Sequence, residues 1–264
     1  MSELPTSLYL PGDDLWVPTG LTRGPWDPGL QHAGPPAALL AREVEAVSAI
    51  AAGQTVRVSF DILRVIPIAP LRIEARLLRP GRRVEQVEAT LAAQDGTPLM
   101  RATAWRMRRE AVELPPGTLR IEPPPPPPEG GEPGDFGSWT DEVAYNKAFD
   151  WRFVAGRFAE PGPATVWTRL LVDLVAGEPV TPLQRLLVMA DAASGVSSVL
   201  DWSLFTFVNI ELGIHLERQP EGEWMAMAAT TRPGPDGAAL CTSVLFDERG
   251  RVGVSTHSLL VAPR

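Results

Sequence analysis

The sequence has very little cysteine and histidine. Cys241 is the only cysteine among 264 residues, so no disulfide can form within the chain, and a reducing compartment is expected. The three histidines are scattered and show no spacing typical of a zinc site. We therefore expect no bound metal.

Long apolar runs and basic clusters are also lacking. No hydrophobic stretch reaches the roughly 18 residues of a membrane-spanning helix, and the first residues lack the basic region of a secretion signal. The chain carries 24 Lys and Arg against 32 Asp and Glu, which gives a net charge of −8 with both signs mixed. We expect a cytoplasmic protein with no membrane span and no nucleic-acid partner.

Several catalytic signatures are missing. The sequence contains no Gly-x-Ser-x-Gly elbow, which argues against a serine hydrolase with a catalytic triad. It also contains no phosphate-binding loop and no dinucleotide fingerprint. We therefore expect no bound organic cofactor.

What the chain does contain is an internal repeat. Arg79-Pro80-Gly81 recurs as Arg232-Pro233-Gly234, and Pro67 recurs as Pro220 the same number of positions later. Each Arg-Pro-Gly is followed by an apolar strand, an acidic turn with glycine and another strand. Such self-similarity indicates a duplicated structural unit.

Each half also contains one apolar helix candidate, at 37–52 and 183–193. Gly34-Pro35-Pro36 opens the first helix, and Thr181 caps the second, with Pro182 and Gln184 at its first and third positions. Alternating apolar residues predict strands at 56–62, 71–77, 84–94 and 99–108, and at 149–156, 164–173, 204–217, 223–231, 238–246 and 252–261.

A helix followed by about four antiparallel strands, written twice, predicts a duplicated α+β module. One helix wrapped by a curled sheet is the hotdog arrangement, so two copies in one chain are a double hotdog. We expect modules at 1–112 and 149–264, with a linker at 113–148 that contains six consecutive prolines. A proline-rich ligand for a partner domain is the other interpretation of that run. Function is expected in the groove between the two unlike halves.

Particular residues resemble a known family. The run from Gln31 to Leu40, Gln-His-Ala-Gly-Pro-Pro-Ala-Ala-Leu-Leu, resembles the helix-entry motif of hotdog thioesterases, in which His or Asn precedes one or two glycines. Trp167, the run from Pro182 to Asp191 and the run from Asn209 to Leu216 resemble the second half of thioesterase-like proteins. The chain is similar to acyl-CoA thioesterase II, a double hotdog enzyme. This resemblance implies an acyl-CoA substrate, a role in lipid metabolism, coenzyme A as part of the substrate and a homodimer.

Thioester hydrolysis needs an activated water, N–H donors for the oxyanion and an apolar slot for the acyl chain. Asp191 is a lone carboxylate on an apolar helix, which is costly unless it is paired or functional. The resemblance places the catalytic aspartate here, where it orients or deprotonates water; the alternative is a solvent-facing residue near the helix end. Gly34 is the best N–H donor at the first helix N-terminus, although it could simply form the turn there.

The resemblance also implies two polar partners of the aspartate, a threonine and a glutamine. Those positions carry Asn209 and His257 in this chain, and a shift of one residue would replace His257 by Ser258. Both side chains can hold a water, and His257 could itself be the general base. His257 could equally be an ordinary strand histidine.

Two further side chains are candidates for substrate binding. Glu211 shares a strand face with Asn209, so it could pair with His257 or Asp191, or face solvent. His32 could contact a ligand at the groove mouth or hydrogen-bond the turn that it starts. One or two apolar residues of a larger set should line the acyl slot: Met189, Trp202, Phe205, Phe207, Met225 and Met227.

The sequence therefore predicts an acyl-CoA thioesterase in which Asp191 positions water. The alternative is a non-catalytic or degenerate acyl-CoA binding protein, because two of the three polar positions differ from the family. A hydratase or dehydratase is a third interpretation, but the Asp-x-Asn-Pro-x-His stretch of those hotdog enzymes is not found at Asp191. The sequence leaves the length and type of the acyl group open.

Overall fold

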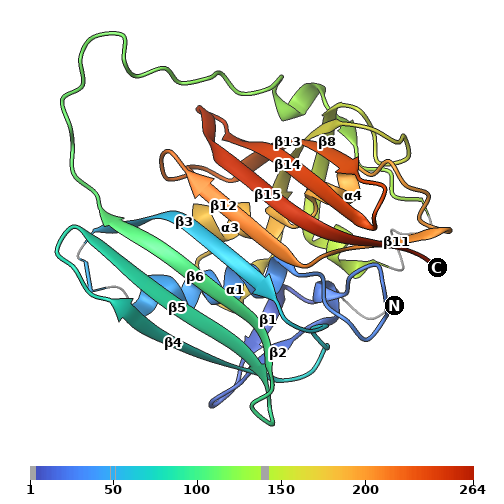
Figure 1. The fold of residues 1–264 in the computed structure, drawn as a ribbon, viewed down its shortest axis with the longest axis horizontal. Coiled ribbons are helices and arrows are strands. Elements are labelled where there is room, and N and C mark those ends of the chain that lie inside the picture. The colour runs from blue at the N-terminus through green and yellow to red at the C-terminus, as the bar shows by residue number, and fades with distance from the viewer. Residues whose placement is uncertain (1–3, 48, 51, 138–142) are drawn as a thin grey trace.

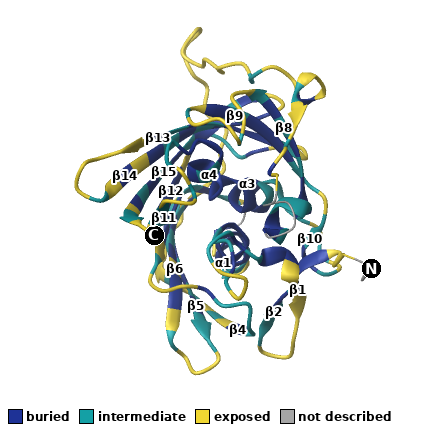
Figure 2. Cartoon of the chain, turned by 90° about the vertical axis from the view of Figure 1, so that its right-hand side faces the viewer, coloured by how far each residue is buried: buried dark blue, intermediate teal, exposed yellow. Residues whose placement is uncertain are grey.

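The computed structural model describes residues 4–47, 49–50, 52–137 and 143–264. The described strands form one continuous, curved 15-stranded sheet around the helices (Figures 1 and 2). The elements of the first half are β1 (Ser7–Pro11), β2 (Trp16–Pro18), η1 (Gly20–Thr22), α1 (Gly34–Val47), β3 (Gly53–Ile62), β4 (Leu71–Arg79), β5 (Val84–Ala93) and β6 (Pro98–Arg108).

The remaining elements belong to the connecting segment and the second half. They are η2 (Pro128–Gly130), β7 (Glu132–Pro133), η3 (Ala144–Ala148), β8 (Phe149–Ala155), β9 (Ala164–Leu170), β10 (Asp173–Val175), α3 (Pro182–Ala190), α4 (Ala193–Val196), β11 (Phe205–Asn209), β12 (Glu211–Leu216), β13 (Trp224–Pro233), β14 (Ala238–Asp247) and β15 (Gly250–Pro263).

The two halves have the same strand order. The first runs β4-β5-β6-β3 and the second β13-β14-β15-β12. Strands β3 and β12 pair antiparallel at the centre, with Asp61 opposite Glu211 and Arg57 opposite His215. In each half a helix precedes these four antiparallel strands, and the second half adds α4 and β11 between its first helix and the four strands.

The helices begin where the sequence indicated. Helix α1 starts at Gly34, and α3 starts after Thr181, whose hydroxyl and the Gln184 side chain form a reciprocal capping box. Helix α1 ends at Val47 rather than at the predicted residue 52. Ala52 has the left-handed φ of 54°, which no helix can continue, and Gly53 begins β3. Residues 48 and 51 of the predicted helix lie outside the described residues.

The predicted strand 204–217 is interrupted. Strand β11 pairs only with β15, whereas β12 pairs with both β15 and β3. Ile210 lies between them and bonds to both neighbours through its backbone, donating to the Ser258 carbonyl and accepting from the Ile62 N–H. The interruption places Asn209 at the end of β11, next to helix α3.

Helices α1 and α3 lie side by side inside the curved sheet (Figure 2). They run antiparallel, because Gly34 at the start of α1 lies against Val188 near the end of α3, and Glu45 at the far end of α1 interacts with Thr181 and Gln184. A Cβ on Gly34 would lie 2.2 Å from the Val188 carbonyl oxygen. Only glycine permits this approach.

The segment that joins the halves is fixed at several points. It arches from the end of β6 to the second half (Figure 1), where the Trp167 indole N–H donates to the Pro126 carbonyl at 2.8 Å. The Arg251 N–H also donates to the Glu122 carbonyl at 2.9 Å. Short elements follow, and residues 138–142 of the predicted linker lie outside the described residues. The predicted boundaries at 112 and 149 stay predictions.

We expect Gly34→Ala to lower the free energy of unfolding by about 1–3 kcal/mol, because the new methyl group forces α1 away from the Val188 carbonyl. Urea denaturation measures this change. Gly130→Ala is the matched control, since a Cβ there meets nothing within 4 Å. Equal stability of the two variants would contradict the close contact.

Candidate active site

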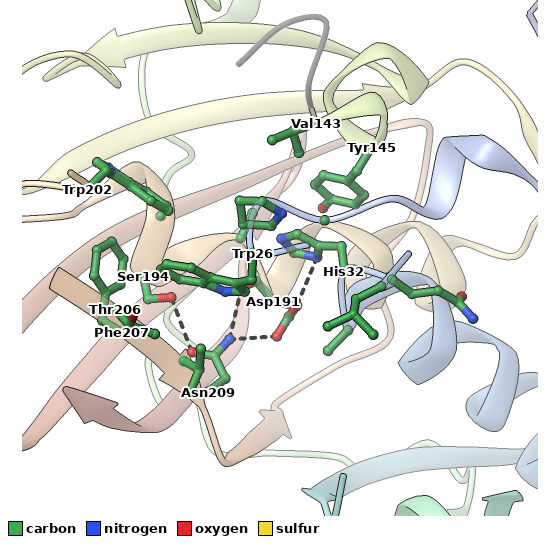
Figure 3. A pocket seen from close by; sticks show the side chains of 18 of the residues that line it. Trp26, His32, Val143, Tyr145, Asp191, Ser194, Trp202, Thr206, Phe207 and Asn209 are labelled. Carbon is green, nitrogen blue, oxygen red and sulfur yellow. Dashed lines mark hydrogen bonds and ion pairs between the residues drawn. The ribbon is translucent and has the colours of Figure 1, made fainter. Parts of the chain in front are cut away.

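A cavity of about 750 Å³ opens between the segments that surround the C-terminal end of α3 (Figure 3). Its size lies within the range typical of small-molecule sites. The lining comes from both halves and from the connecting segment, and among the described residues it includes Trp26, His32, Tyr145, Asp191, Asn209 and Arg264. Most of the lining side chains are apolar, and His32, Ser194 and Asn209 form a polar group with Asp191.

Asp191 is the C-cap residue of α3, and its side chain is only 4% exposed. Its Oδ2 lies 2.8 Å from His32 Nδ1, and its Oδ1 accepts a hydrogen bond of 2.7 Å from Asn209 Nδ2 (Figure 3). Each carboxylate oxygen therefore has a donor. Charge-assisted hydrogen bonds of this kind compensate for the cost of burying an anion.

These partners keep Asp191 ionised. Burial alone would raise the pKa of its carboxyl, but the charge and hydrogen bond of His32 oppose it, with smaller contributions from the charge of His257 and the Asn209 amide. The result is a pKa lowered from 3.8 to about 2. At neutral pH the carboxylate is a fixed negative charge.

The Asn209 amide is oriented by a second polar neighbour. Ser194 Oγ donates to Asn209 Oδ1 at 3.2 Å, so the amide nitrogen faces Asp191 (Figure 3). That nitrogen also lies 3.2 Å from the Asp191 carbonyl oxygen. The chain of Ser194, Asn209 and Asp191 thus fixes which way every group points.

The His32 ring is held by stacking. It lies parallel to the Tyr145 ring, with 3.9 Å between the centroids. The Tyr145 hydroxyl is anchored in turn, donating to the Val188 carbonyl at 2.6 Å. The backbone N–H of His32 donates to the Thr22 carbonyl at 2.8 Å, so backbone and ring are both fixed.

The protonation of His32 follows from its partners. Because Asp191 is ionised and has no proton to give, the 2.8 Å contact requires a hydrogen on His32 Nδ1. The Gly34 N–H lies 3.3 Å from the same nitrogen, which then has no lone pair to offer it.

Aromatic rings form much of the apolar wall. Trp26 stacks on Trp202 with 5.4 Å between centroids, and Phe207 lies 4.4 Å from Trp202. Trp202 and Phe207 belong to the set from which the sequence predicted slot residues, and both line the cavity. The methionines of that set, Met189, Met225 and Met227, are buried in the core instead.

Not every predicted site residue borders the cavity. Among the described residues, its lining includes His32, Asp191 and Asn209, but not Gly34, Glu211, Ser258 or His257. Glu211 Oε1 accepts a hydrogen bond of 2.7 Å from the Ser258 N–H, so these two residues bind each other. Their roles as substrate contacts stay predictions.

His257 is fully buried on β15. Burial lowers the pKa of its imidazole, against the charges of Asp191 and Glu211, which raise it. The Ala190 backbone lies beside the ring, but neither ring nitrogen has a described partner in good hydrogen-bond geometry. Of the two residues that the sequence left open, His257 is the one whose pKa, lowered by burial, is raised in part by the Asp191 charge. Which of them acts in the site stays a prediction.

Sequence reasoning missed three residues of this site. Ser194 follows Asp191 by three positions, the spacing of one helical turn, which was a usable signal. Trp26 lies in a loop and Tyr145 in the short η3, where no periodicity in the sequence indicates which way a side chain points. Only the folded chain brings them to the cavity.

Other kinds of site were also considered. Within the described parts of the chain, no group of three or more His, Cys, Asp and Glu side chains is arranged to hold a metal ion. Over the same residues, no helix is long and apolar enough to cross a membrane.

The lowered pKa of Asp191 makes a prediction about acid unfolding. The carboxyl has a lower pKa in the folded chain than the 3.8 of the unfolded chain, so its ionisation stabilises the fold at pH values above 3.8. This stabilisation is lost as the pH falls towards the folded-state pKa of about 2. The shift corresponds to about 2 kcal/mol at 1.36 kcal/mol per pKa unit. Urea unfolding measured at several pH values should therefore show that the free energy of unfolding falls less steeply with decreasing pH in Asp191→Asn than in the original chain. If this pH dependence is unchanged in Asp191→Asn, or changes equally in the exposed Asp236→Asn, the lowered pKa of Asp191 is refuted.

Solved structures with this fold are numerous, although no curated protein sequence matches the chain. A candidate thioesterase II from Thermobifida fusca YX superimposes with a TM-score of 0.75 at 22% identity, covering 97% of this chain and 96% of that one. A protein with a hot dog fold from Alicyclobacillus acidocaldarius has a TM-score of 0.74 at 16% identity, and the match covers 98% of this chain and 96% of that one. An acyl-CoA thioesterase II from Mycobacterium marinum gives 0.64 at 16% identity, also covering 98% and 96%. At these identities the likeness establishes a hotdog-type fold.

Family profiles are more specific. Residues 22–107 match the acyl-CoA thioesterase N-terminal domain, and residues 121–261 match the acyl-CoA thioesterase C-terminal domain. The second match alone spans more than half of the chain. The predicted resemblance is confirmed, and the chain belongs to the acyl-CoA thioesterase family of thioester hydrolases.

Proposed function

We propose that this protein is a double hotdog enzyme that hydrolyses an acyl-CoA thioester to a free acid and coenzyme A. The observation that carries the proposal is the buried, ionised Asp191, held between His32 and Asn209 in the wall of an apolar cavity of about 750 Å³. A fixed charge beside an apolar slot can activate a water and hold an acyl chain at the same time.

Each requirement of the reaction has a candidate group. The Asp191 charge positions the attacking water, with Asn209 fixing the carboxylate. The Gly34 N–H, at the positive end of the α1 dipole, stabilises the oxyanion that forms on the thioester oxygen. The aromatic wall around Trp202 and Phe207 takes the acyl group. His257 lies behind the cavity wall, where its buried ring packs near Asp191.

The same proposal covers the partners. The substrate supplies coenzyme A, so no separate cofactor is needed, and we propose a cytoplasmic homodimer that acts in lipid metabolism. Arg64 and Arg264 are the cations of the cavity lining, and positive charge there suits the phosphates of coenzyme A.

A non-catalytic acyl-CoA binding protein is the second candidate. It is favoured by the substitution of Asn209 and His257 for the threonine and glutamine of the related enzymes, and by the complete burial of His257. Such a protein would bind acyl-CoA in the cavity and release no thiol.

Asp191→Asn separates the two candidates. If the carboxylate drives hydrolysis, release of coenzyme A thiol from a series of straight-chain acyl-CoAs should fall by about 10²- to 10³-fold, the cost of losing one main electrostatic group. Asp236→Asn, an exposed turn variant, should keep full activity. Micromolar binding without turnover by the original chain would favour the binding protein, and hydrolysis unaffected by Asp191→Asn would remove the catalytic assignment.

The apolar slot makes a second prediction. Each methylene that enters it should raise kcat/KM about fourfold, from roughly 0.8 kcal/mol per buried CH₂, until the slot is full. Gly195 lines the cavity, and a Cβ there would lie 3.7 Å from the Trp202 ring, an ordinary contact. Gly195→Ala should therefore narrow the slot without strain and move the plateau to a shorter acyl chain. An unchanged chain-length profile would show that the acyl group binds elsewhere.

A further inference from the structure

His32 is placed to do more than hold Asp191. The two oxygens of Asp191 already accept hydrogen bonds from His32 and Asn209, and the side chain is 4% exposed. Asp191 can orient and stabilise its neighbours, but it has little capacity to take a proton from water.

The other nitrogen of His32 is free. Nδ1 carries a hydrogen directed at Asp191, so in the neutral ring the lone pair lies on Nε2. Among the residues that the structure describes, Nε2 has no hydrogen-bond partner. The side chain is 13% exposed and lines the cavity, so a water in the cavity can reach it.

The position of this lone pair is fixed before substrate arrives. The ring cannot turn, because it stacks on Tyr145 on one side and binds Asp191 at its edge. The titratable groups that face it are Asp191 from the end of α3, His257 from β15 and Tyr145 from η3. Burial lowers the pKa of His257 and raises that of Tyr145, so both are neutral at pH 7 and the Asp191 carboxylate is the charge that acts on His32.

We propose that His32 is the general base of this site, and that Asp191 is a positioning residue that fixes the ring through Nδ1. This inference rests on the proposed thioesterase function and assigns its proton transfer. It gives His32 a catalytic part in addition to the contact with substrate predicted from the sequence.

The proton and electron balance is simple. Nε2 of His32 takes one proton from water while the water oxygen bonds to the thioester carbon, and the carbonyl π electrons move to oxygen, which the Gly34 N–H stabilises. The carbonyl then re-forms and the C–S bond breaks. The imidazolium returns its proton to the departing sulfur, which leaves a carboxylic acid, a thiol and a neutral His32. Asp191 stays ionised throughout and stabilises the imidazolium while it exists.

His32→Asn is the sharpest test. The asparagine amide can still donate to Asp191 from nearly the place of Nδ1, but it has no group equivalent to Nε2. We expect kcat/KM for acyl-CoA hydrolysis to fall by about 10²- to 10⁴-fold, the usual contribution of a general base. The decline of kcat/KM on the acid side of the pH profile should also disappear. In His32→Ala, added imidazole should restore part of the rate.

Two controls keep the outcomes separate. His215→Asn changes an exposed histidine of β12 and should leave activity within about twofold. Thermal melting and acyl-CoA binding of each variant distinguish loss of chemistry from loss of fold. If His32→Asn keeps its activity within about tenfold and retains the acid-side decline, Asp191 itself takes the proton and this inference is wrong. If the original chain hydrolyses no acyl-CoA at all, the proposed function fails first.

Discussion

The close approach of α1 to α3 at Gly34 and Val188 determines where the polar groups of the site meet. His32 lies two residues before that contact on one chain segment, and Asp191 lies three residues after it on the other. The Val188 carbonyl also accepts the Tyr145 hydroxyl, so the same atom fixes the ring on which His32 stacks. A backbone packing distance thus sets the geometry of a charged pair.

That pair illustrates how a buried charge is maintained. An isolated carboxylate inside a protein becomes protonated, because desolvation disfavours the anion. Here the imidazole and the amide offset this cost, and the Asn209 amide is itself held by Ser194. Removing only one of these donors is costly, because it leaves the buried charge without compensation. Such networks specify one arrangement of side chains more strongly than apolar packing does.

The sequence predicted much of this fold for local physical reasons. The capping box at Thr181 and the glycine-proline entry at Gly34 are short-range signals, and the repeat of Arg-Pro-Gly placed matching hairpins in each half. The interruption at Ile210 was not visible, because it depends on β3 pairing along β12 while β11 pairs with β15. The site was predicted only in part. Asp191, Asn209 and His32 were identified, whereas the direction of the His257 ring and the arrival of Tyr145 depend on contacts between remote segments.

The far end of the helix pair shows what the duplication did not preserve. There Arg106 is buried, donates to the Val44 carbonyl at 2.9 Å and lies within ion-pair distance of Glu85. The connecting segment crosses the molecule once and delivers Tyr145 to the Asp191 end. Two separate, identical modules would pair symmetrically, so both ends of the helix pair would carry the same side chains. Because the halves are joined in one chain, one end can hold the buried Asp191 with His32, and the other can hold the buried Arg106 with Glu85.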